Sequence, residues 1–295
     1  MAKNILKATS VVLVMNLVVK LLGFLRETSL ANAFGAGPLS DAYLSAYTIP
    51  YFLQAILGYA LVTAVVPILT KHLVAGHKDE ASYVGSAIIN LTAVALAGVT
   101  LLGIIVCDWL VKLLAPGYGP EQAALTANLA RIMFPSVVFM GVGMVLTGIC
   151  NAHYRFAVSA FAPGMSNIII IVSLLFFSAA YGIFGAAWGT LLSFVGFFVV
   201  QLPVLWQIGF KYRPVLDLQH PDVRQLLREI GPIVLGVAVN QIYFAVNRIF
   251  ASGLAEGTIS NINYANKLMM LPLGIFVAAV ANAIYPALAE FSLRK

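Results

Sequence analysis

Residues 183–208 read IFGAAWGTLLSFVGFFVVQLPVLWQI and contain no charged residue. A helix of about 20 apolar residues crosses the hydrocarbon core of a bilayer, so this stretch predicts a membrane-spanning helix. Hydropathy over windows of about 19 residues predicts further spans at 6–32, 41–70, 83–113, 122–150, 157–180, 231–254 and 264–290. The predicted fold class is therefore all-α, a polytopic helical membrane protein with about eight transmembrane helices.

The composition of the whole chain agrees with a lipid environment. Of 295 residues, 61% are hydrophobic and 9% are charged, whereas roughly 25% are charged in an ordinary soluble domain. Mean hydropathy is +0.95. These values exclude a soluble enzyme, a secreted disulfide scaffold and a disordered tail.

The net charge of +6 raises the question of a nucleic-acid partner. The 17 Lys and Arg residues are scattered and form no basic run with interleaved aromatic residues, so we expect none. Cys107 and Cys150 lie in apolar stretches without a further Cys or His at metal-ligand spacing. We therefore expect no metal and no cofactor.

Loop charges predict the orientation. With a cytoplasmic N-terminus, nearly all Lys and Arg residues outside the spans fall on the cytoplasmic side, and only Lys112 falls outside. This asymmetry follows the positive-inside rule and places both termini in the cytoplasm. Asp108 stands four residues before Lys112 and could pair with it. His72 and His77 lie in a predicted cytoplasmic loop and are expected to be solvated.

An internal repeat divides the chain. Gly37-Pro38-Leu39-Ser40-Asp41 recurs as Gly257-Thr258-Ile259-Ser260-Asn261, and each copy precedes a long apolar helix. Six predicted spans separate the copies, so they share one orientation, as in parallel-repeat transporters. We predict a six-helix lobe over 1–208, a cytoplasmic amphipathic linker over 209–230, and the first two helices of a second lobe over 231–295. A basic solvated linker is the alternative for 209–230, where Val223, Leu226, Leu227 and Ile230 share one helical face.

Five basic residues fall inside predicted spans: Lys20, Arg26, Arg131, Arg248 and Lys267. A charge at a helix centre costs about 2.5–3.5 kcal/mol on insertion scales, which favours a water-filled cavity, an ion pair or a substrate path. Single sites have simpler explanations, because Arg26, Glu27 and Lys267 could snorkel to the interface and Asp41 could cap its own helix.

Taken together, these charges concentrate on the repeat-equivalent helices. Pseudosymmetry would bring those helices together, and a cavity with surplus positive charge there suits a phosphate or pyrophosphate. The sequence has no nucleophile elbow, phosphate-cradling Gly-Lys loop or His-Glu metal helix, so we expect no catalytic residues. Gly185 and Gly189 fit the small-xxx-small pattern of close helix packing.

Several motifs resemble the MurJ (MviN) family of lipid II flippases. They are Leu22-Gly23-Phe24-Leu25-Arg26-Glu27, Phe34-Gly35-Ala36-Gly37-Pro38-Leu39-Ser40-Asp41-Ala42-Tyr43, Ile49-Pro50, Val66-Pro67-Ile68-Leu69, Asn240-Gln241-Ile242, Asn247-Arg248, Ala251-Ser252, Tyr264-Ala265-Asn266-Lys267 and Leu271-Pro272-Leu273-Gly274-Ile275-Phe276. The resemblance covers nearly the whole chain.

The resemblance implies an exporter of the multidrug/oligosaccharidyl-lipid/polysaccharide type in a bacterial cytoplasmic membrane. Such a protein moves undecaprenyl-pyrophosphate-linked peptidoglycan precursor between leaflets by alternating access. It further implies that the central basic residues, which would hold the pyrophosphate, are Lys20, Arg26 and Lys267, and Arg248 is a fourth candidate. Asp41 matches an acidic position, and Asp41 and Glu27 are candidates for coupling to an ion or the membrane potential.

This sequence departs from the family pattern in two respects. Tyr51-Phe52-Leu53-Gln54-Ala55 stands where many members carry an Arg pair, and members are close to twice this length. Expected partners are lipid II or a related polyprenyl-pyrophosphate lipid, the membrane, the remaining lobe and cell-wall synthesis proteins. The alternatives are an exporter of another polyprenyl-linked glycan or a drug, and a non-transporting cell-envelope assembly scaffold.

Overall fold

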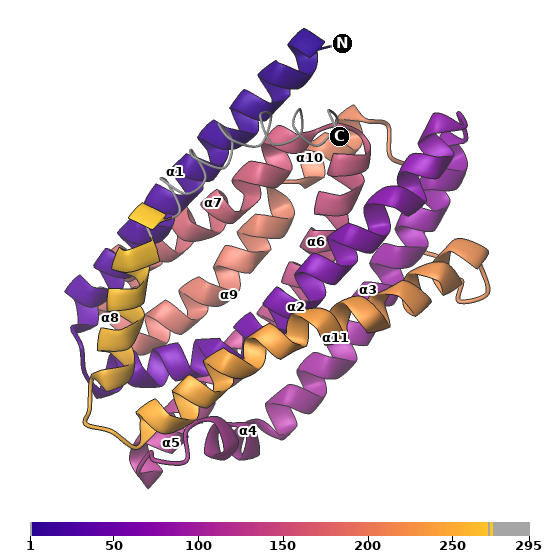
Figure 1. The fold of residues 1–295 in the computed structure, drawn as a ribbon. Helices are drawn as coiled ribbons and strands as arrows, with labels where there is room; N and C mark the ends of the chain where they lie inside the picture. Colours follow the sequence, from indigo (N-terminus) through magenta and orange to yellow (C-terminus); the bar gives the residue numbers. More distant parts are fainter. Residues whose placement is uncertain (1, 271, 274–295) are drawn as a thin grey trace, which may run out of the picture.

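The structure, a computed structural model, describes residues 2–270 and 272–273, and every regular element in them is a helix (Figure 1). The elements are α1 (Ala2–Phe34), α2 (Pro38–Val74), α3 (Lys78–Ile105), α4 (Cys107–Leu114), α5 (Pro120–Met133), α6 (Ser136–Ala152), α7 (Phe156–Val172), the π-helix η1 (Ser173–Phe177), α8 (Ser178–Tyr181), α9 (Ile183–Val199), α10 (Leu202–Gln207) and α11 (Pro221–Ser252). Residues 258–270 are also helical. The all-α prediction is confirmed.

Within the described residues, four helical segments are long and apolar enough to cross a membrane, at 38–74, 78–105, 156–181 and 183–207. Two bent pairs, α5 with α6 and the two halves of α11, raise the number to six. These six coincide with six of the eight predicted spans. The predicted span 6–32 coincides with helix α1, which is not among the six, and 264–290 falls largely outside the described residues.

Besides the bend within α11, two predicted spans are broken rather than continuous. The span 83–113 divides into α3 and α4, which meet at Val106. The span 122–150 divides at Phe134-Pro135, where α5 and α6 meet at 41°. Pro135 has no N–H to give to the preceding turn, and its ring displaces the carbonyl four residues earlier, which accounts for the second break.

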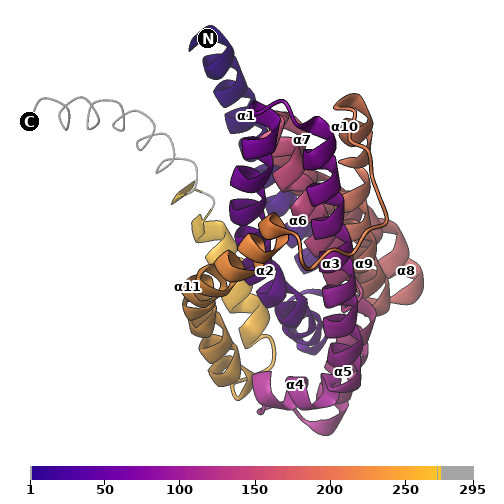
Figure 2. The same cartoon turned by 90° about the vertical axis from the view of Figure 1, so that its right-hand side faces the viewer.

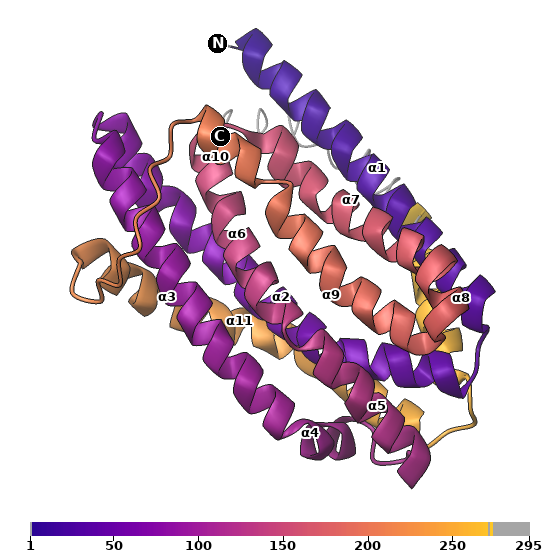
Figure 3. The ribbon, with the colours of Figure 1, turned by 180° about the vertical axis from the view of Figure 1, so that it is seen from behind.

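A tight turn at Gly182 joins α8 to α9. Gly182 has φ +58°, which a residue without a Cβ adopts at little cost. Gly185 and Gly189 then let α9 approach the preceding helix, since an added Cβ would lie 2.6 Å from the Phe177 carbonyl oxygen and 2.1 Å from Ser173 Oγ. The predicted close packing at these glycines is confirmed. Figure 3 shows α7 and α9 side by side.

The segment 208–220 crosses the surface of α3 as an extended strap (Figure 2). Its backbone bonds a polar stripe on α3, in which Lys211 N–H donates to Ser82 Oγ at 3.4 Å and Arg213 N–H donates to Ser86 Oγ at 3.0 Å. Asn90 Nδ2 donates to the carbonyl oxygens of Arg213 and Val215 at 3.0 and 2.9 Å. Spacing of four residues puts the three α3 side chains on one helix face. The strap therefore satisfies polar groups on an otherwise apolar helix.

The strap ends at a buried carboxylate. Asp222 is 4% exposed, and its two oxygens lie 2.5 Å from Lys71 Nζ and 2.7 Å from His72 Nε2 at the end of α2. His220 Nδ1 accepts a hydrogen bond from the Asp222 N–H, and its Nε2 lies 3.0 Å from Glu80 Oε1. The expectation that His72 is solvated is wrong, because a buried carboxylate needs hydrogen-bond donors.

Helix α11 runs without interruption through the predicted boundary at 230/231. Val223 and Leu226 are 1% exposed against α2 and α3, whereas Leu227 is 49% exposed. Leu227 therefore does not belong to the buried face on which it was predicted to lie. The division into lobes over 1–208 and 231–295 stays a prediction.

The pair that the spacing allows between Asp108 and Lys112 does not form. Asp108 instead pairs with Arg131 across the junction of α4 and α5, and Arg131 Nη1 also donates to Asn128 at 2.9 Å. The chain reversal after α4 brings the two charges together. Arg131, one of the five predicted intramembrane charges, is thus explained by an ion pair.

We expect Asn90→Ala to loosen the strap. Its amide makes the two bonds to the strap backbone and accepts from Tyr212 OH at 2.7 Å. At about 1 kcal/mol for each hydrogen bond, the Lys211 and Arg213 amides should exchange with deuterium more than roughly tenfold faster. Asn247→Ala is the control, since Asn247 Nδ2 donates to Tyr243 O within its own helix, away from the strap. Equal exchange in the Asn90 variant and the unmodified chain would contradict this account.

Candidate functional site

Asp41 joins the two copies of the repeat. Its carboxylate accepts hydrogen bonds from the Gly257 N–H and the Ser260 N–H, both at 2.7 Å, and from the Ser260 hydroxyl. The side chain is 3% exposed. The first N–H groups of a helix have no partner within the helix and carry partial positive charge. Asp41 therefore caps the helix that begins at residue 258.

The alternative that Asp41 caps its own helix is wrong. The N-cap of α2 is Gly37, which makes no side-chain capping hydrogen bond. The Asp41 N–H is itself used in the helix, where it donates to Gly37 O at 2.9 Å. Its carboxylate projects across to the second pentapeptide instead, because the chain returns through α11 to the same end of the bundle.

The backbones of the two pentapeptides also approach closely. Gly257 has φ +83°, and an added Cβ would lie 2.9 Å from the Ala36 carbonyl oxygen. Only glycine combines this conformation with this approach without strain. The structure thus brings the repeat copies into direct contact, as the predicted pseudosymmetry requires.

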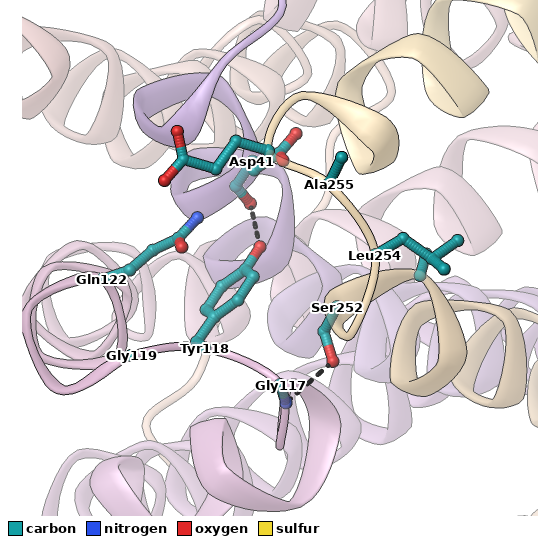
Figure 4. Close-up of a pocket in the computed structure, with 10 residues that line it drawn as sticks. Asp41, Gly117, Tyr118, Gly119, Gln122, Ser252, Leu254 and Ala255 are labelled. Atoms are coloured by element: carbon teal, nitrogen blue, oxygen red, sulfur yellow. Dashed lines mark hydrogen bonds between the residues drawn. The ribbon is translucent and has the colours of Figure 1, made fainter.

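The loop between α4 and α5 completes this junction. Tyr118 OH donates to the Asp41 carbonyl oxygen at 3.0 Å, and the Gly117 N–H donates to Ser252 Oγ at 3.2 Å (Figure 4). These residues line a cavity of about 160 Å³ together with Gln122, Glu256 and neighbouring residues. The cavity lies where three chain segments converge, and we name this end of the molecule the Asp41 junction.

A charged cluster lies beside the Asp41 junction. Arg26 Nη2 lies 2.5 Å from Glu27 Oε1, and Asn263 Nδ2 donates to Glu27 Oε2 at 3.0 Å. Glu27 is 6% exposed. Lys267 stands one helical turn beyond Asn263 and interacts electrostatically with both Arg26 and Glu27. We call Arg26, Glu27, Asn263 and Lys267 the basic cluster.

Aromatic side chains of α2 border the basic cluster. The Arg26 guanidinium lies 6.0 Å from the centre of the Tyr47 ring, within the range of a cation–π interaction. Tyr47 in turn packs against Tyr51, with ring centres 5.8 Å apart. The aromatic surface holds the guanidinium without neutralising its charge.

The other predicted binding residues occupy different places. Arg248 interacts electrostatically with Tyr118 and Asp41, so it belongs to the Asp41 junction rather than to the basic cluster. Lys20 lies six residues before Arg26, about 9 Å along the helix axis, and its side chain is exposed. Of the four predicted basic residues, the structure brings together Arg26 and Lys267, with Glu27 between them.

Sequence reasoning missed Asn263 and Tyr118. Asn263 stands four residues before Lys267, a spacing that puts both on one helix face and could have drawn attention to it. Tyr118 lies within Pro116-Gly117-Tyr118-Gly119-Pro120, which has turn chemistry only. Nothing in that segment indicates a contact with Asp41.

Comparison with known proteins gives consistent matches. The family described as lipid II flippase MurJ matches residues 30–294. The probable lipid II flippase MurJ of Buchnera aphidicola subsp. Acyrthosiphon pisum is 30% identical over 292 residues, and the lipid II flippase MurJ of Burkholderia cenocepacia is 31% identical over 296 residues. Each match covers 97% of this chain and 57% of the relative. The chain therefore spans little more than half the length of these relatives.

Solved structures match in the same way. A lipid II flippase MurJ in an inward closed conformation superposes with a TM-score of 0.78 at 25% identity, covering 92% of this chain and 57% of that one. A transporter of the MOP superfamily from Pyrococcus furiosus superposes with a TM-score of 0.66 at 20% identity, covering 90% and 60%. The second match shows the fold alone.

We expect Asp41→Asn to open the Asp41 junction. The amide keeps the shape but loses the charge and one acceptor, and hydrogen bonds to a charged group contribute about 1.5–3 kcal/mol. The Gly257 and Ser260 amides should then exchange with deuterium at least roughly tenfold faster. Asp79→Asn is the matched control, because its exposed carboxylate pairs with Lys211 far from this junction. Unchanged protection of both amides would show that Asp41 does not hold the second repeat.

Proposed function

Because the chain belongs to the lipid II flippase MurJ family, we propose that it takes part in moving lipid II, the undecaprenyl-pyrophosphate-linked peptidoglycan precursor, across the bacterial cytoplasmic membrane for cell wall synthesis. The observation that carries the proposal is the basic cluster, in which Arg26 from one repeat and Lys267 from the other meet around a single carboxylate. A pyrophosphate carries several negative charges and requires such a site.

Binding is electrostatic in this proposal. A guanidinium offers two parallel donors to one phosphate group. An ammonium on a flexible stem can bind the second phosphate group as a point charge. Arg26 is held by Tyr47 and Glu27, so its geometry is set before the ligand arrives. Lys20 lies farther along the same helix and would receive the phosphates along the path. The prenyl chain stays in lipid, and no covalent bond forms or breaks.

Alternating access follows from the position of the Asp41 junction. With both termini in the cytoplasm, the junction faces the outside and the Asp222 end faces the cytoplasm. The junction closes the outer side while Asp41 holds the second repeat. Release of these bonds opens that side, and rocking of the lobes over 1–208 and 231–295 exchanges one opening for the other.

Asp41 and Glu27 are the candidate carriers of coupling to an ion or to the membrane potential. Both carboxylates are buried and both bond the second repeat. A change of charge on either would weaken a contact between the lobes. The proposed partners of the chain are the remaining second-lobe helices and proteins of cell wall synthesis.

Binding of undecaprenyl pyrophosphate tests the proposal. We expect Arg26→Ala and Lys267→Gln each to weaken its binding to the chain in nanodiscs by roughly tenfold or more, because each removes a charged phosphate contact worth about 1.5–3 kcal/mol. Lipid II should compete with this ligand, and undecaprenyl monophosphate should bind less tightly. Arg131→Gln is the control, since Arg131 is also an arginine in an ion pair but pairs with Asp108 between α4 and α5, outside the basic cluster.

Two outcomes would contradict the proposal. Equal affinity in the Arg26 and control variants would exclude the basic cluster as the phosphate site. If a different lipid-linked sugar competes with undecaprenyl pyrophosphate for binding and lipid II does not, the result would favour an exporter of another polyprenyl-linked glycan. Binding can be followed by microscale thermophoresis at one fixed salt concentration, because salt screens these contacts.

A further inference from the structure

Glu27 is a buried carboxylate placed between two cations. Oε1 lies 2.5 Å from Arg26 Nη2, and Oε2 accepts a hydrogen bond from Asn263 Nδ2 at 3.0 Å. A carboxylate that is 6% exposed requires donors for both oxygens. One oxygen is thus occupied by a cation and the other by a neutral amide.

Lys267 would be the natural competitor for the second oxygen. It lies on the same helix as Asn263, four residues later, and four residues place two side chains on one face. It interacts electrostatically with Glu27 and Arg26, yet it makes no ion pair with any residue that the structure describes. An ammonium on a flexible four-carbon stem pairs readily with a nearby carboxylate. The absence of an ion pair between Lys267 and Glu27 therefore calls for an explanation.

We propose, on the basis of the proposed function, that Asn263 is a positioning residue that keeps Lys267 available for phosphate. Its amide fills the second oxygen of Glu27 without adding charge. The three ammonium donors of Lys267 are then left for an anionic ligand. Without the amide, Lys267 pairs with Glu27, and the ligand has to break that ion pair before it can bind.

The position of Asn263 depends on the Asp41 junction. Ser260, held by Asp41 through its N–H and its hydroxyl, stands three residues before Asn263 on the first turn of the same helix. The Asp41 carboxylate, which fixes the start of the helix, therefore also fixes the position at which the Asn263 amide meets Glu27. Asn261, whose side chain is exposed, lies on this turn and offers a matched amide outside the cluster.

A double-mutant cycle separates this role from a purely structural one. Affinity for undecaprenyl pyrophosphate is measured for the full 295-residue chain in nanodiscs, with Asn263→Ala made alone and in the Lys267→Gln background. Alone, we expect Asn263→Ala to weaken binding roughly tenfold, the loss of about one charged hydrogen bond. In the Lys267→Gln background we expect less than about a twofold change, because no ammonium remains to be captured. Asn261→Ala should leave the affinity unchanged.

Each outcome decides the question. Full affinity in Asn263→Ala, or the same loss with and without Lys267, overturns the role of Asn263 while the proposed function stands. Failure of the unmodified chain to prefer undecaprenyl pyrophosphate over the monophosphate overturns both. Thermal unfolding of each variant in the same nanodiscs shows whether a loss of affinity comes from a loss of folded protein.

Discussion

The carboxylate of Asp41 is the interaction on which the arrangement of the site depends. It is buried, and it replaces water with three donors from the start of the helix at 258. A charge in an apolar environment is tolerated only with such compensation, so the contact is both costly to break and specific in geometry. Because that helix carries Asn263 and Lys267, the same contact places the second half of the basic cluster against Arg26 and Glu27.

The partners of the charged and titratable side chains were the least predictable part of the structure. Local spacing offered Asp41 as a cap of its own helix and Lys112 as a partner of Asp108, and it left His72 to water. Each of the three side chains instead bonds a residue from a different element. Local spacing shows which groups can meet along one helix, but where water is scarce a charge takes the donor that packing brings to it. The partner therefore depends on where the chain reverses direction, and the spacing of residues along one helix does not show this.

The helices and the meeting of Arg26 with Lys267 were predictable for physical reasons. Apolar length fixes which segments can cross a membrane, and six predicted spans coincide with helices or bent helix pairs. The repeat of residues 37–41 at 257–261 required equivalent helices to adjoin, which places their charges together. The breaks at Val106 and Phe134-Pro135 were not predictable from hydropathy, because an apolar window has the same score whether the helix is straight or bent.

Helix α11 is tied to α2 at both of its ends. Asp222 holds its first turn to Lys71 and His72, and beyond its last turn Gly257 is bonded to Asp41. Between these ties the helix bends by 40°, where the segment ending at Val239 meets the segment beginning at Gln241. If the Asp41 tie breaks while the Asp222 tie holds, a change in this bend would let the far half of α11 move. The strap on α3 adds further hydrogen bonds just before the Asp222 tie, so the chain is anchored on both α2 and α3 where α11 begins.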